Sequence, residues 1–406
     1  MQRSTWRDRT LHAVVAAATV TAVTMSGLVA ADPAVAGPHQ EIAWAPCAED
    51  PTAECGTLAV PVDWQHPAGA TFDLALARRR ATDPAARIGS LVVNPGGPGG
   101  SGVDFVIYGA DTFSADVTRR FDLVGFDPRG VARSHPVVCS AELLTAAPPS
   151  RLTSQADFAA MVAYNRALAA DCRQRTGPLF DHVDTLSVVR DLDAIRAAVG
   201  DRKLTYYGVS YGTLIGQEYA EVFGDRIRAL VIDSNMDHSL DTSGFLTTET
   251  VTGEDSFDEF AAWCDRTAGC ALHAKGVRAV YTDLKVRAAG DGLVLRVRLD
   301  DEVIEIQVDE VVLPQLLFGG FYGPDWWFMA EILAALDAGT VVELSTTAAS
   351  AAAAGPGVAV ARGGVADRVL AGALPGRGKR PVGYQAGHPA AVAAPAAAPA
   401  AALAAE

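Results

Sequence analysis

The chain has 406 residues and a formal net charge of −15, with 33 Lys and Arg against 48 Asp and Glu. At roughly 150 residues per domain, this length fits one large domain with an insertion, or two domains. Half of the residues are hydrophobic, which excludes a fibrous chain and one that is disordered over most of its length. The acidic balance argues against a nucleic-acid-binding protein, which would need a basic patch to displace counterions from phosphate.

The first 36 residues predict a secretory signal peptide. Three arginines precede an apolar, Ala-rich run over residues 11–31, and Ala34-Val35-Ala36 follows as a cleavage site. The alternative, a membrane anchor, is disfavoured by the alanine content and by the cleavage pattern. No later stretch reaches the apolar length of a membrane span. We therefore expect a secreted chain that begins near Gly37 and has no stable span after cleavage.

All six cysteines follow the predicted cleavage site, and an even number in an exported chain predicts disulfides. Metal binding is the weaker alternative, because no CxxC spacing and no clustered histidines accompany them. We expect neither a metal nor a cofactor. The order along the chain favours three local pairs: Cys47–Cys55, Cys139–Cys172 and Cys264–Cys270.

Predicted strands and helices alternate between residues 70 and 235. Short apolar runs that end in Gly or Pro are typical of buried parallel strands, and apolar residues every three or four positions indicate helices. The sequence predicts strands over 91–94, 121–127, 204–209 and 228–232, and helices over 186–199 and 211–223. This order predicts an α/β fold, a mostly parallel sheet with helices on both faces, in a core over residues 37–236.

The pattern changes over residues 237–340, which we interpret as a cap inserted over the sheet. Ser256-Phe257-Asp258-Glu259 has the pattern of a capping box that opens a helix. Residues 293–308 predict a hairpin that turns near Asp300-Asp301. An aromatic cluster over residues 318–328 leads into a further helix, and we interpret it as cap core in preference to a substrate wall.

The final segment, residues 341–406, has another composition. From residue 345 it holds 24 Ala, 9 Gly and 6 Pro, so it lacks the bulky side chains of central strands. We expect a disordered or loosely helical tail and a sheet that is incomplete at its C-terminal end.

Gly208-Val209-Ser210-Tyr211-Gly212 matches the G-x-S-x-G pattern of a nucleophile elbow. The pattern alone is weak, but it falls where a predicted strand meets a predicted helix, as an elbow must. A sharp turn there lifts the serine oxygen above the sheet, and the flanking glycines leave room for it. The motif predicts Ser210 as a catalytic nucleophile, against the alternative of an ordinary turn serine.

A second motif, residues 94–102 with the sequence NPGGPGGSG, directly follows a buried strand. In serine hydrolases an amide from this loop joins the amide after the nucleophile to hold an oxyanion. The donors here would be Gly97, or Gly96, and Tyr211. A phosphate-binding loop is the alternative, but it would need a following Lys-Ser/Thr or an acid at dinucleotide spacing.

A third segment, residues 125–134 with the sequence GFDPRGVARS, runs from a strand end into a turn. Together these motifs resemble the exported α/β-hydrolase family of tripeptidyl and prolyl aminopeptidases of actinomycete-type bacteria. The resemblance extends from Trp44 to Asp233 and more loosely to Asp337, and it includes the segments 54–58, 191–196 and 210–213. It implies an α/β-hydrolase fold with a cap, and a serine peptidase that takes peptides with free amino termini.

Members of that family supply the catalytic Asp and His from their last third, after two further strands. The Ala/Gly/Pro-rich tail stands in that place here, with Asp367 and His388 as its candidates. Asp233 ends a predicted strand and His238 follows it, although capping or loop hydrogen bonds are the simpler roles for them. We interpret His135 and His182 as surface or loop residues. Without a general base the serine stays a weak nucleophile.

Two classes of function follow. The first is a secreted serine aminopeptidase that releases short peptides through an acyl-enzyme on Ser210, with a cap acid, Glu249, Glu254 or Asp255, pairing with the substrate amine. The second is a hydrolase-like binding protein without a base, truncated or with a tail that arose by a reading-frame shift. The other two frames beyond codon 340 test the frame shift, which predicts an Asp-containing strand and a Gly-His segment there. An esterase on the same fold is a further alternative.

Overall fold

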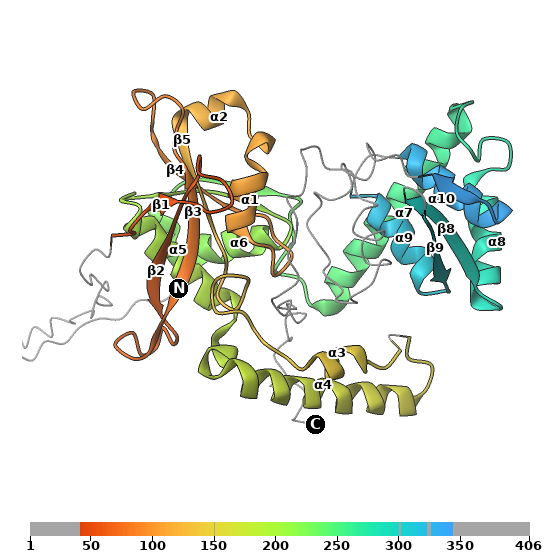
Figure 1. The fold of residues 1–406 in the computed structure, drawn as a ribbon, viewed down its shortest axis with the longest axis horizontal. Helices are drawn as coiled ribbons and strands as arrows, with labels where there is room; N and C mark the ends of the chain where they lie inside the picture. Colours follow the sequence, from red (N-terminus) through yellow and green to blue (C-terminus); the bar gives the residue numbers. More distant parts are fainter. Residues whose placement is uncertain (1–40, 150, 300–301, 323–325, 344–406) are drawn as a thin grey trace, which may run out of the picture. The chain divides into compact units, whose positions relative to one another are not determined.

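The computed structural model describes residues 41–149, 151–299, 302–322 and 326–343, which Figure 1 shows as a ribbon. The predicted signal peptide and the tail beyond residue 343 lie outside the described residues. Up to residue 233 the main elements are β1 Ala45–Pro46, β2 Glu54–Pro61, β3 Thr71–Arg79, β4 Gly89–Asn94, α1 Gly102–Tyr108, α2 Ala115–Arg120, β5 Phe121–Phe126, α3 Ala141–Thr145, α4 Gln155–Thr176, α5 Thr185–Ala198, β6 Leu204–Val209, α6 Tyr211–Phe223 and β7 Ile227–Asp233.

The strands of this part form one sheet in the order β1-β2-β3-β5-β4-β6-β7. The strands β5, β4, β6 and β7 run parallel to one another. At the other side of the sheet, β3 pairs antiparallel with β5, and β2 and β1 continue antiparallel. The predicted α/β architecture with a mostly parallel sheet is confirmed, and each strand and helix predicted between residues 91 and 232 is found.

Alternating side chains of the strands build a core on each face of the sheet. Leu74 and Leu76 of β3 belong to a cluster with α5 and α6, whereas Ala75 and Ala77 belong to a cluster with α1. Successive side chains of a strand point to opposite faces, so these two clusters lie on opposite sides. The prediction of helices on both faces is therefore confirmed.

The strand β7 forms the last position of the sheet among the described residues. Its side chains are largely open to solvent: Val231 is 51% exposed and Ile232 is 37% exposed. An open edge with apolar residues is a site where further strands can pair. The expectation that the sheet ends incomplete stays a prediction, because the residues after 343 are not described.

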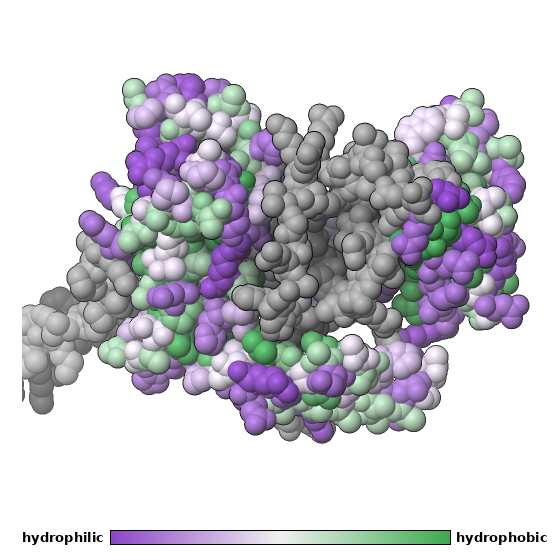
Figure 2. Space-filling model, in the orientation of Figure 1, coloured by the Kyte–Doolittle hydropathy of each residue, from purple (hydrophilic) through white to green (hydrophobic). Residues whose placement is uncertain are grey.

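Two elements of the core carried no clear sequence signal. Helix α4 is 22 residues long, but only Cys172 and Thr176 are buried in it, and Figure 2 shows hydrophilic and hydrophobic residues intermingled along its visible surface. A helix without an apolar stripe is invisible to periodicity. The antiparallel pair β2–β3 has a weak sequence signal as well, because one of its faces holds small and polar residues, among them Thr57, Ala59, Ala75 and Ala77.

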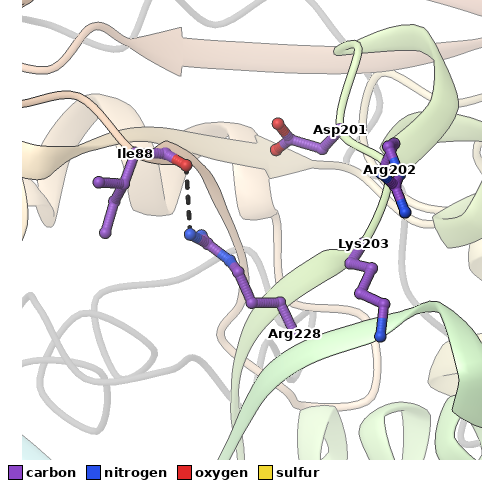
Figure 3. A pocket seen from close by; sticks show the side chains of 5 residues that line it. All are labelled: Ile88, Asp201, Arg202, Lys203 and Arg228. Carbon is purple, nitrogen blue, oxygen red and sulfur yellow. Dashed lines mark hydrogen bonds between the residues drawn. The ribbon is translucent and has the colours of Figure 1, made fainter.

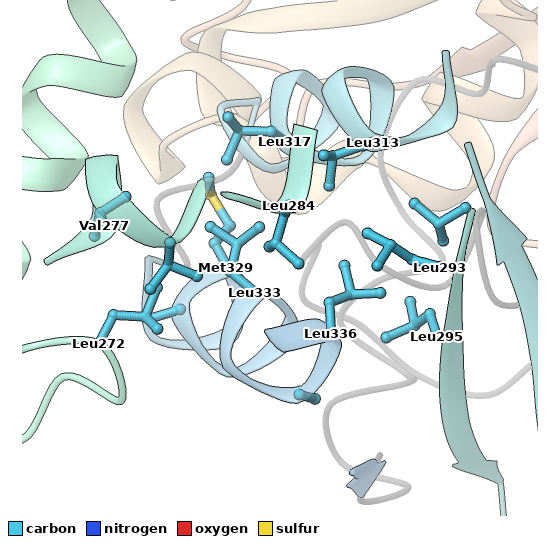
Figure 4. Packing of buried hydrophobic residues seen from close by; sticks show 14 of the residues in the cluster. Leu272, Val277, Leu284, Leu293, Leu295, Leu313, Leu317, Met329, Leu333 and Leu336 are labelled. Atoms are coloured by element: carbon cyan, nitrogen blue, oxygen red, sulfur yellow. The ribbon is translucent and has the colours of Figure 1, made fainter. Parts of the chain in front are cut away.

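The part of the chain from residue 242 to 343 has its own hydrophobic core. Its elements are α7 Thr242–Arg266, α8 Val277–Ala289, β8 Leu293–Leu299, β9 Glu302–Val308, α9 Val312–Gly320, α10 Trp326–Ala338 and β10 Val341–Glu343. Figure 4 shows leucines of the helices facing Leu293 and Leu295 of β8. The strands β8 and β9 form the predicted hairpin, and its turn, residues 300–301, is outside the described residues. Strand β10 pairs parallel with β8, beyond the boundary expected at residue 340.

Two expectations for this part need revision. Helix α7 begins at Thr242 with Asp241 as its N-cap, so the prediction that Ser256–Glu259 opens it is wrong. The Ser256 hydroxyl instead donates back to the carbonyl of Thr252 at 2.8 Å, as serines inside helices often do. The aromatic cluster is divided: Trp326 packs against the core, whereas Tyr322 is 64% and Trp327 is 50% exposed.

The three predicted disulfides are present, Cys47–Cys55, Cys139–Cys172 and Cys264–Cys270. In the described part of the chain, no helix combines the length and the apolarity that crossing a bilayer requires. Nor do the described residues bring together three or more side chains that could hold a metal ion.

Candidate active site

Ser210 lies at the turn between β6 and α6 with φ +53° and ψ −124°, a conformation that costs energy for any residue with a side chain. The residues that flank this turn must be glycines, because a side chain at either position would collide with the backbone. A Cβ on Gly208 would lie 2.3 Å from the carbonyl oxygen of Gly212, and one on Gly212 would lie 2.8 Å from that of Asn94. Strand and helix therefore approach so closely that the serine is held at a sharp bend, as in a nucleophile elbow.

The glycine loop between β4 and α1 lies directly against this turn. A Cβ on Gly96 would be 2.3 Å from the carbonyl oxygen of Val209 and 3.0 Å from the amide nitrogen of Tyr211. Gly96 has φ +87° and Gly97 has φ +119°, values open to glycine and rare for other residues. The loop therefore contacts the backbone on both sides of Ser210.

The hydrogen bonds of the loop distinguish between its two candidate amides. The Gly96 amide donates to Asn94 Oδ1 at 2.9 Å, so it is already used. Among the described residues no hydrogen bond engages the Gly97 amide. The Tyr211 amide is the first of α6 and has no acceptor within the helix. Among the described residues, the Gly97 and Tyr211 amides are thus the two candidate donors without a hydrogen-bond acceptor.

The side chain of Tyr211 ties the turn to the neighbouring helix. Its hydroxyl shares a 2.7 Å hydrogen bond with Thr185 Oγ1 at the start of α5. Burial raises the pKa of Tyr211, partly opposed by this hydrogen bond. Beneath it, the fully buried Tyr206 hydroxyl donates to the Gly212 carbonyl at 2.9 Å. The hydroxyls of Tyr206 and Tyr211 therefore anchor the backbone that follows Ser210.

Asp233 lies next to the turn, but its carboxylate is engaged elsewhere. Its backbone carbonyl accepts the Ser210 amide at 2.9 Å, which continues the β6–β7 ladder. Its Oδ2 accepts the Tyr207 hydroxyl at 2.8 Å. The pKa of Tyr207 is raised to about 12, first by burial and then by this carboxylate.

We predict that Asp233→Asn lowers the pKa of Tyr207, because it removes the negative charge that opposes ionisation of the phenol. A raised pKa in the folded state contributes stability that is complete below pH 10 and is lost as the pH rises to about 12. NMR titration of the tyrosine Cζ resonances checks this, with Tyr207→Phe identifying the signal. An unchanged titration in Asp233→Asn would show that the two groups do not interact.

His238 is directed away from Ser210. The loop after β7 runs along α6, where the Met236 amide donates to Thr213 Oγ1 and His238 Nε2 lies 3.2 Å from Glu221 Oε1. Glu221 is near the far end of α6, roughly 15 Å along the helix from the serine at 1.5 Å per residue. The structure does not bring this histidine to the turn.

The other described histidines of the core have other partners, and His66 Nδ1 lies 2.6 Å from Asp63 Oδ2. His135 Nε2 lies 3.3 Å from the Thr176 carbonyl, and His182 Nδ1 lies 3.9 Å from Asp63. Asp367 and His388, the predicted acid and base of the tail, lie outside the described residues. Within the described part of the chain, no hydrogen bond engages Ser210 Oγ.

The three acids suggested for the substrate amine all lie on α7. The charge of Glu249 contributes, after burial, to a raised pKa of Tyr322, so this carboxylate is near an exposed aromatic residue. The charge of Glu254 likewise contributes, after burial, to a raised pKa of Tyr281 on α8. Asp255 follows on the same helix, and the role of all three stays a prediction.

A pocket lined by Ile88, Asp201, Arg202, Lys203 and Arg228 is at the opposite end of the strands (Figure 3). These residues come before or at the start of β4, β6 and β7, whereas Ser210 follows the end of β6. The Arg228 guanidinium there donates to the Ile88 carbonyl at 3.2 Å and to Thr205 Oγ1 at 2.7 Å. This pocket therefore lies at the other end of β6 from Ser210.

Two buried polar residues near the turn belong to the motifs of residues 94–102 and 125–134, but the sequence alone assigned them no role. Asn94 ends β4, and Asp127 follows β5 directly; they are 1% and 0% exposed. Both come at carboxyl ends of parallel strands, next to the glycine loop. Position at that edge of an α/β sheet is the signal that could have identified them.

Comparison with known proteins agrees with this geometry. Residues 89–291 match the model of the alpha/beta hydrolase fold family. The chain is 42% identical over 253 residues to the serine protease Hip1 of Mycobacterium tuberculosis, covering 59% of this chain and 48% of that protein. It is 37% identical over 262 residues to a tripeptidyl aminopeptidase of Streptomyces lividans, covering 61% and 49%.

A third relative, named carboxylesterase B, from Mycobacterium tuberculosis, is 36% identical over 227 residues, which cover 54% of this chain and 43% of that protein. The chain thus spans about half the length of the curated relatives it matches. The family match itself covers half of the chain and includes the sheet from β4 to β7, the glycine loop and the serine turn. The chain belongs to the alpha/beta hydrolase fold family.

Proposed function

We propose that the chain is a secreted serine hydrolase of the peptidase type, with Ser210 as its nucleophile. The observation that carries the proposal is the contact of Gly96 with the strained serine turn, in a loop whose Gly97 amide, like the Tyr211 amide, has no hydrogen-bond acceptor among the described residues. Relatives named as a serine protease and a tripeptidyl aminopeptidase support the peptidase class. The three disulfides support an oxidising, extracellular location.

In the proposed reaction, Ser210 Oγ attacks the carbonyl carbon of the substrate while a general base removes its proton. The carbonyl oxygen becomes an oxyanion that accepts hydrogen bonds from the Gly97 and Tyr211 amides. The intermediate expels the amine, which takes a proton from the conjugate acid of the base, and leaves an acyl-enzyme on Ser210. Water then attacks this ester and releases the acid product.

The proposal still requires an acid and a base. Of the candidates predicted from the sequence, Asp233 is bonded to Tyr207 and His238 is paired with Glu221, which leaves Asp367 and His388 for these roles. An aminopeptidase would further need an acid for the substrate amine, and the candidates that we propose are Glu249, Glu254 and Asp255 of α7.

A second candidate function is a binding protein that keeps the hydrolase fold without turnover. It is favoured by the absence of a histidine partner for Ser210 among the described residues. The two functions differ in their reaction with a fluorophosphonate, because a serine without a base is a weak nucleophile.

We predict that the wild-type chain is labelled by a fluorophosphonate and that Ser210→Ala is not. Ser134→Ala is the matched control, since Ser134 is another serine at a turn of the core. A folded wild-type chain that stays unlabelled would favour the binding protein. Turnover of a tripeptide anilide with a free amino terminus, compared with its acetylated form and with a nitrophenyl ester, then separates an aminopeptidase from an esterase.

A further inference from the structure

The glycine loop is secured at both ends. At its beginning, Asn94 Oδ1 accepts the Gly96 amide, and the Gly100 amide donates to the Gly96 carbonyl at 3.0 Å. At its end, Ser101 is the N-cap of α1 and its Oγ accepts the Asp104 amide at 3.0 Å. The loop between these points carries the Gly97 amide.

The second anchor depends on Asp127, a carboxylate with no exposed surface. Its Oδ1 accepts hydrogen bonds from the Ser101 hydroxyl and, at 3.2 Å, from the Val103 amide. Its Oδ2 accepts the Arg133 amide at 3.1 Å and lies 3.5 Å from the guanidinium of the same residue. One buried side chain thus joins the end of β5, the start of α1 and the turn after residue 128.

The electrostatic surroundings of Asp127 oppose one another. The pKa of Asp127 is raised, first because burial penalises its charged form, although the hydrogen bonds from Ser101 and Arg133 and the charge of Arg133 counteract the shift. The Arg133 guanidinium also pairs with Glu49 at 3.0 Å and with Asp104 at 2.9 Å. A buried carboxylate is tolerated only while such donors remain in place. The loss of one hydrogen bond to Asp127 should therefore weaken the others.

The backbone packing prevents the loop from moving independently of β5. A Cβ on Gly102 would lie 2.3 Å from the carbonyl oxygen of Phe126, and one on Gly125 would lie 1.9 Å from the carbonyl oxygen of Gly102. The start of α1 therefore rests directly on the strand that Asp127 follows. Because Gly96 lies against Val209 in the same way, the loop is held between two strand ends.

We propose that Asp127 is a positioning residue that fixes the glycine loop, through Ser101, so that the Gly97 amide stays beside Ser210. The inference rests on the proposed function and adds to it. Asp127 is hydrogen-bonded to Ser101 at the end of the loop and to Val103, and no hydrogen bond joins it to Ser210 among the described residues, so its effect on the reaction passes through the loop. The Gly96 amide donates to Asn94 at the end of β4, and the Gly100 amide donates to Gly96 within the loop. Hydrogen exchange of these two amides therefore measures how well the loop is ordered.

The test uses hydrogen exchange resolved to single residues in the full chain. We expect Asp127→Asn and Ser101→Ala to raise exchange of the Gly96 and Gly100 amides at least about tenfold. Ser101→Thr keeps the hydroxyl and should keep the protection. Asp193→Asn is the control for loss of a largely buried carboxylate, since Asp193 binds Arg196 and Tyr219 on α5 and α6, and it should leave both amides unchanged.

The same variants are compared in their rate of fluorophosphonate labelling. Asp127→Asn and Ser101→Ala should slow labelling roughly 10–100-fold, as expected when an oxyanion donor is displaced, while Ser101→Thr and Asp193→Asn should not. Unchanged exchange in the first two variants would overturn the proposal, and so would raised exchange with unchanged labelling. If the wild-type chain is not labelled at all, the proposed function fails, and the exchange arm alone decides whether Asp127 holds the loop.

Discussion

Asp191→Ala should lower the free energy of unfolding by about 3–5 kcal/mol, because it leaves a buried guanidinium without its counterion. Arg129 and Asp191 are both fully buried, and they form a two-pronged ion pair with nitrogen–oxygen distances of 2.7 and 2.6 Å. Asp191 Oδ1 also accepts a hydrogen bond from Trp64 Nε1 at 2.9 Å. Urea unfolding followed by far-ultraviolet circular dichroism measures the change.

The reason for so large an effect is that Arg129 uses all its donors on the protein. Besides Asp191, its guanidinium donates to three backbone carbonyls, those of Pro61, Val62 and His182, at 2.9–3.1 Å. It therefore ties the end of β2 and the segment before α5 to the turn after β5. Arg129→Lys keeps the charge but cannot reproduce this fork, so it should be destabilising too.

The matched control is the double variant Arg129→Met with Asp191→Leu. The double variant also loses the bonds to the three carbonyls and to Trp64, but it leaves no unpaired buried charge, so it should cost less than the sum of the two single variants. A cost below about 1 kcal/mol for Asp191→Ala would contradict the account, because it would mean that the pair is hydrated in solution.

Gly96→Ala should reduce fluorophosphonate labelling of Ser210 by about 10²–10³-fold, the loss expected when an oxyanion donor is removed. The added Cβ would meet the Val209 carbonyl oxygen at 2.3 Å, which forces the loop away from the serine turn. The loop would carry the Gly97 amide with it. The labelling rate of each variant, measured at equal folded concentration, gives the result.

Gly200→Ala is the control for the backbone strain alone. Gly200 has φ +83°, close to the +87° of Gly96, but nothing lies within 4 Å of a Cβ built on it. Both variants therefore place a side chain at a similar positive φ, and only Gly96→Ala adds the collision. Equal labelling rates in the two variants would show that the loop does not need its contact with the turn.

The serine turn was predictable because all of its determinants are local in sequence. A strand, a turn that only glycines can flank and a helix follow one another within residues 204–223, and the structure has them at the predicted bounds. The disulfides followed from order along the chain in the same way. Cys47–Cys55 and Cys264–Cys270 are separated by only 8 and 6 residues.

The determinants that were missed act across distance. Asp127 gains its partners from Ser101 and Val103, 26 and 24 residues away, and Arg129 meets Asp191 across 62 residues. No periodicity marks such contacts before the sheet is assembled. The choice of Gly97 over Gly96 also needed the structure, since only the hydrogen bond to Asn94 distinguishes two adjacent glycines.

The start of α7 shows a different kind of failure. Ser256 and Glu259 have the spacing of a capping box, but the helix already runs through them from Thr242. The residues before Ser256 are rich in Thr and Gly, which have low helix propensity, so the sequence suggested that the helix had not begun. Burial of Phe257 and Phe260 further along the same helix stabilises it as a whole.

A crystal structure of the chain after reaction with a fluorophosphonate tests the central claim most directly. The account predicts phosphorus bonded to Ser210 Oγ, and one phosphonyl oxygen within about 2.7–3.1 Å of both the Gly97 and the Tyr211 amide nitrogens. A phosphonyl oxygen turned away from these amides, or a reagent bonded to a residue other than Ser210, would contradict it.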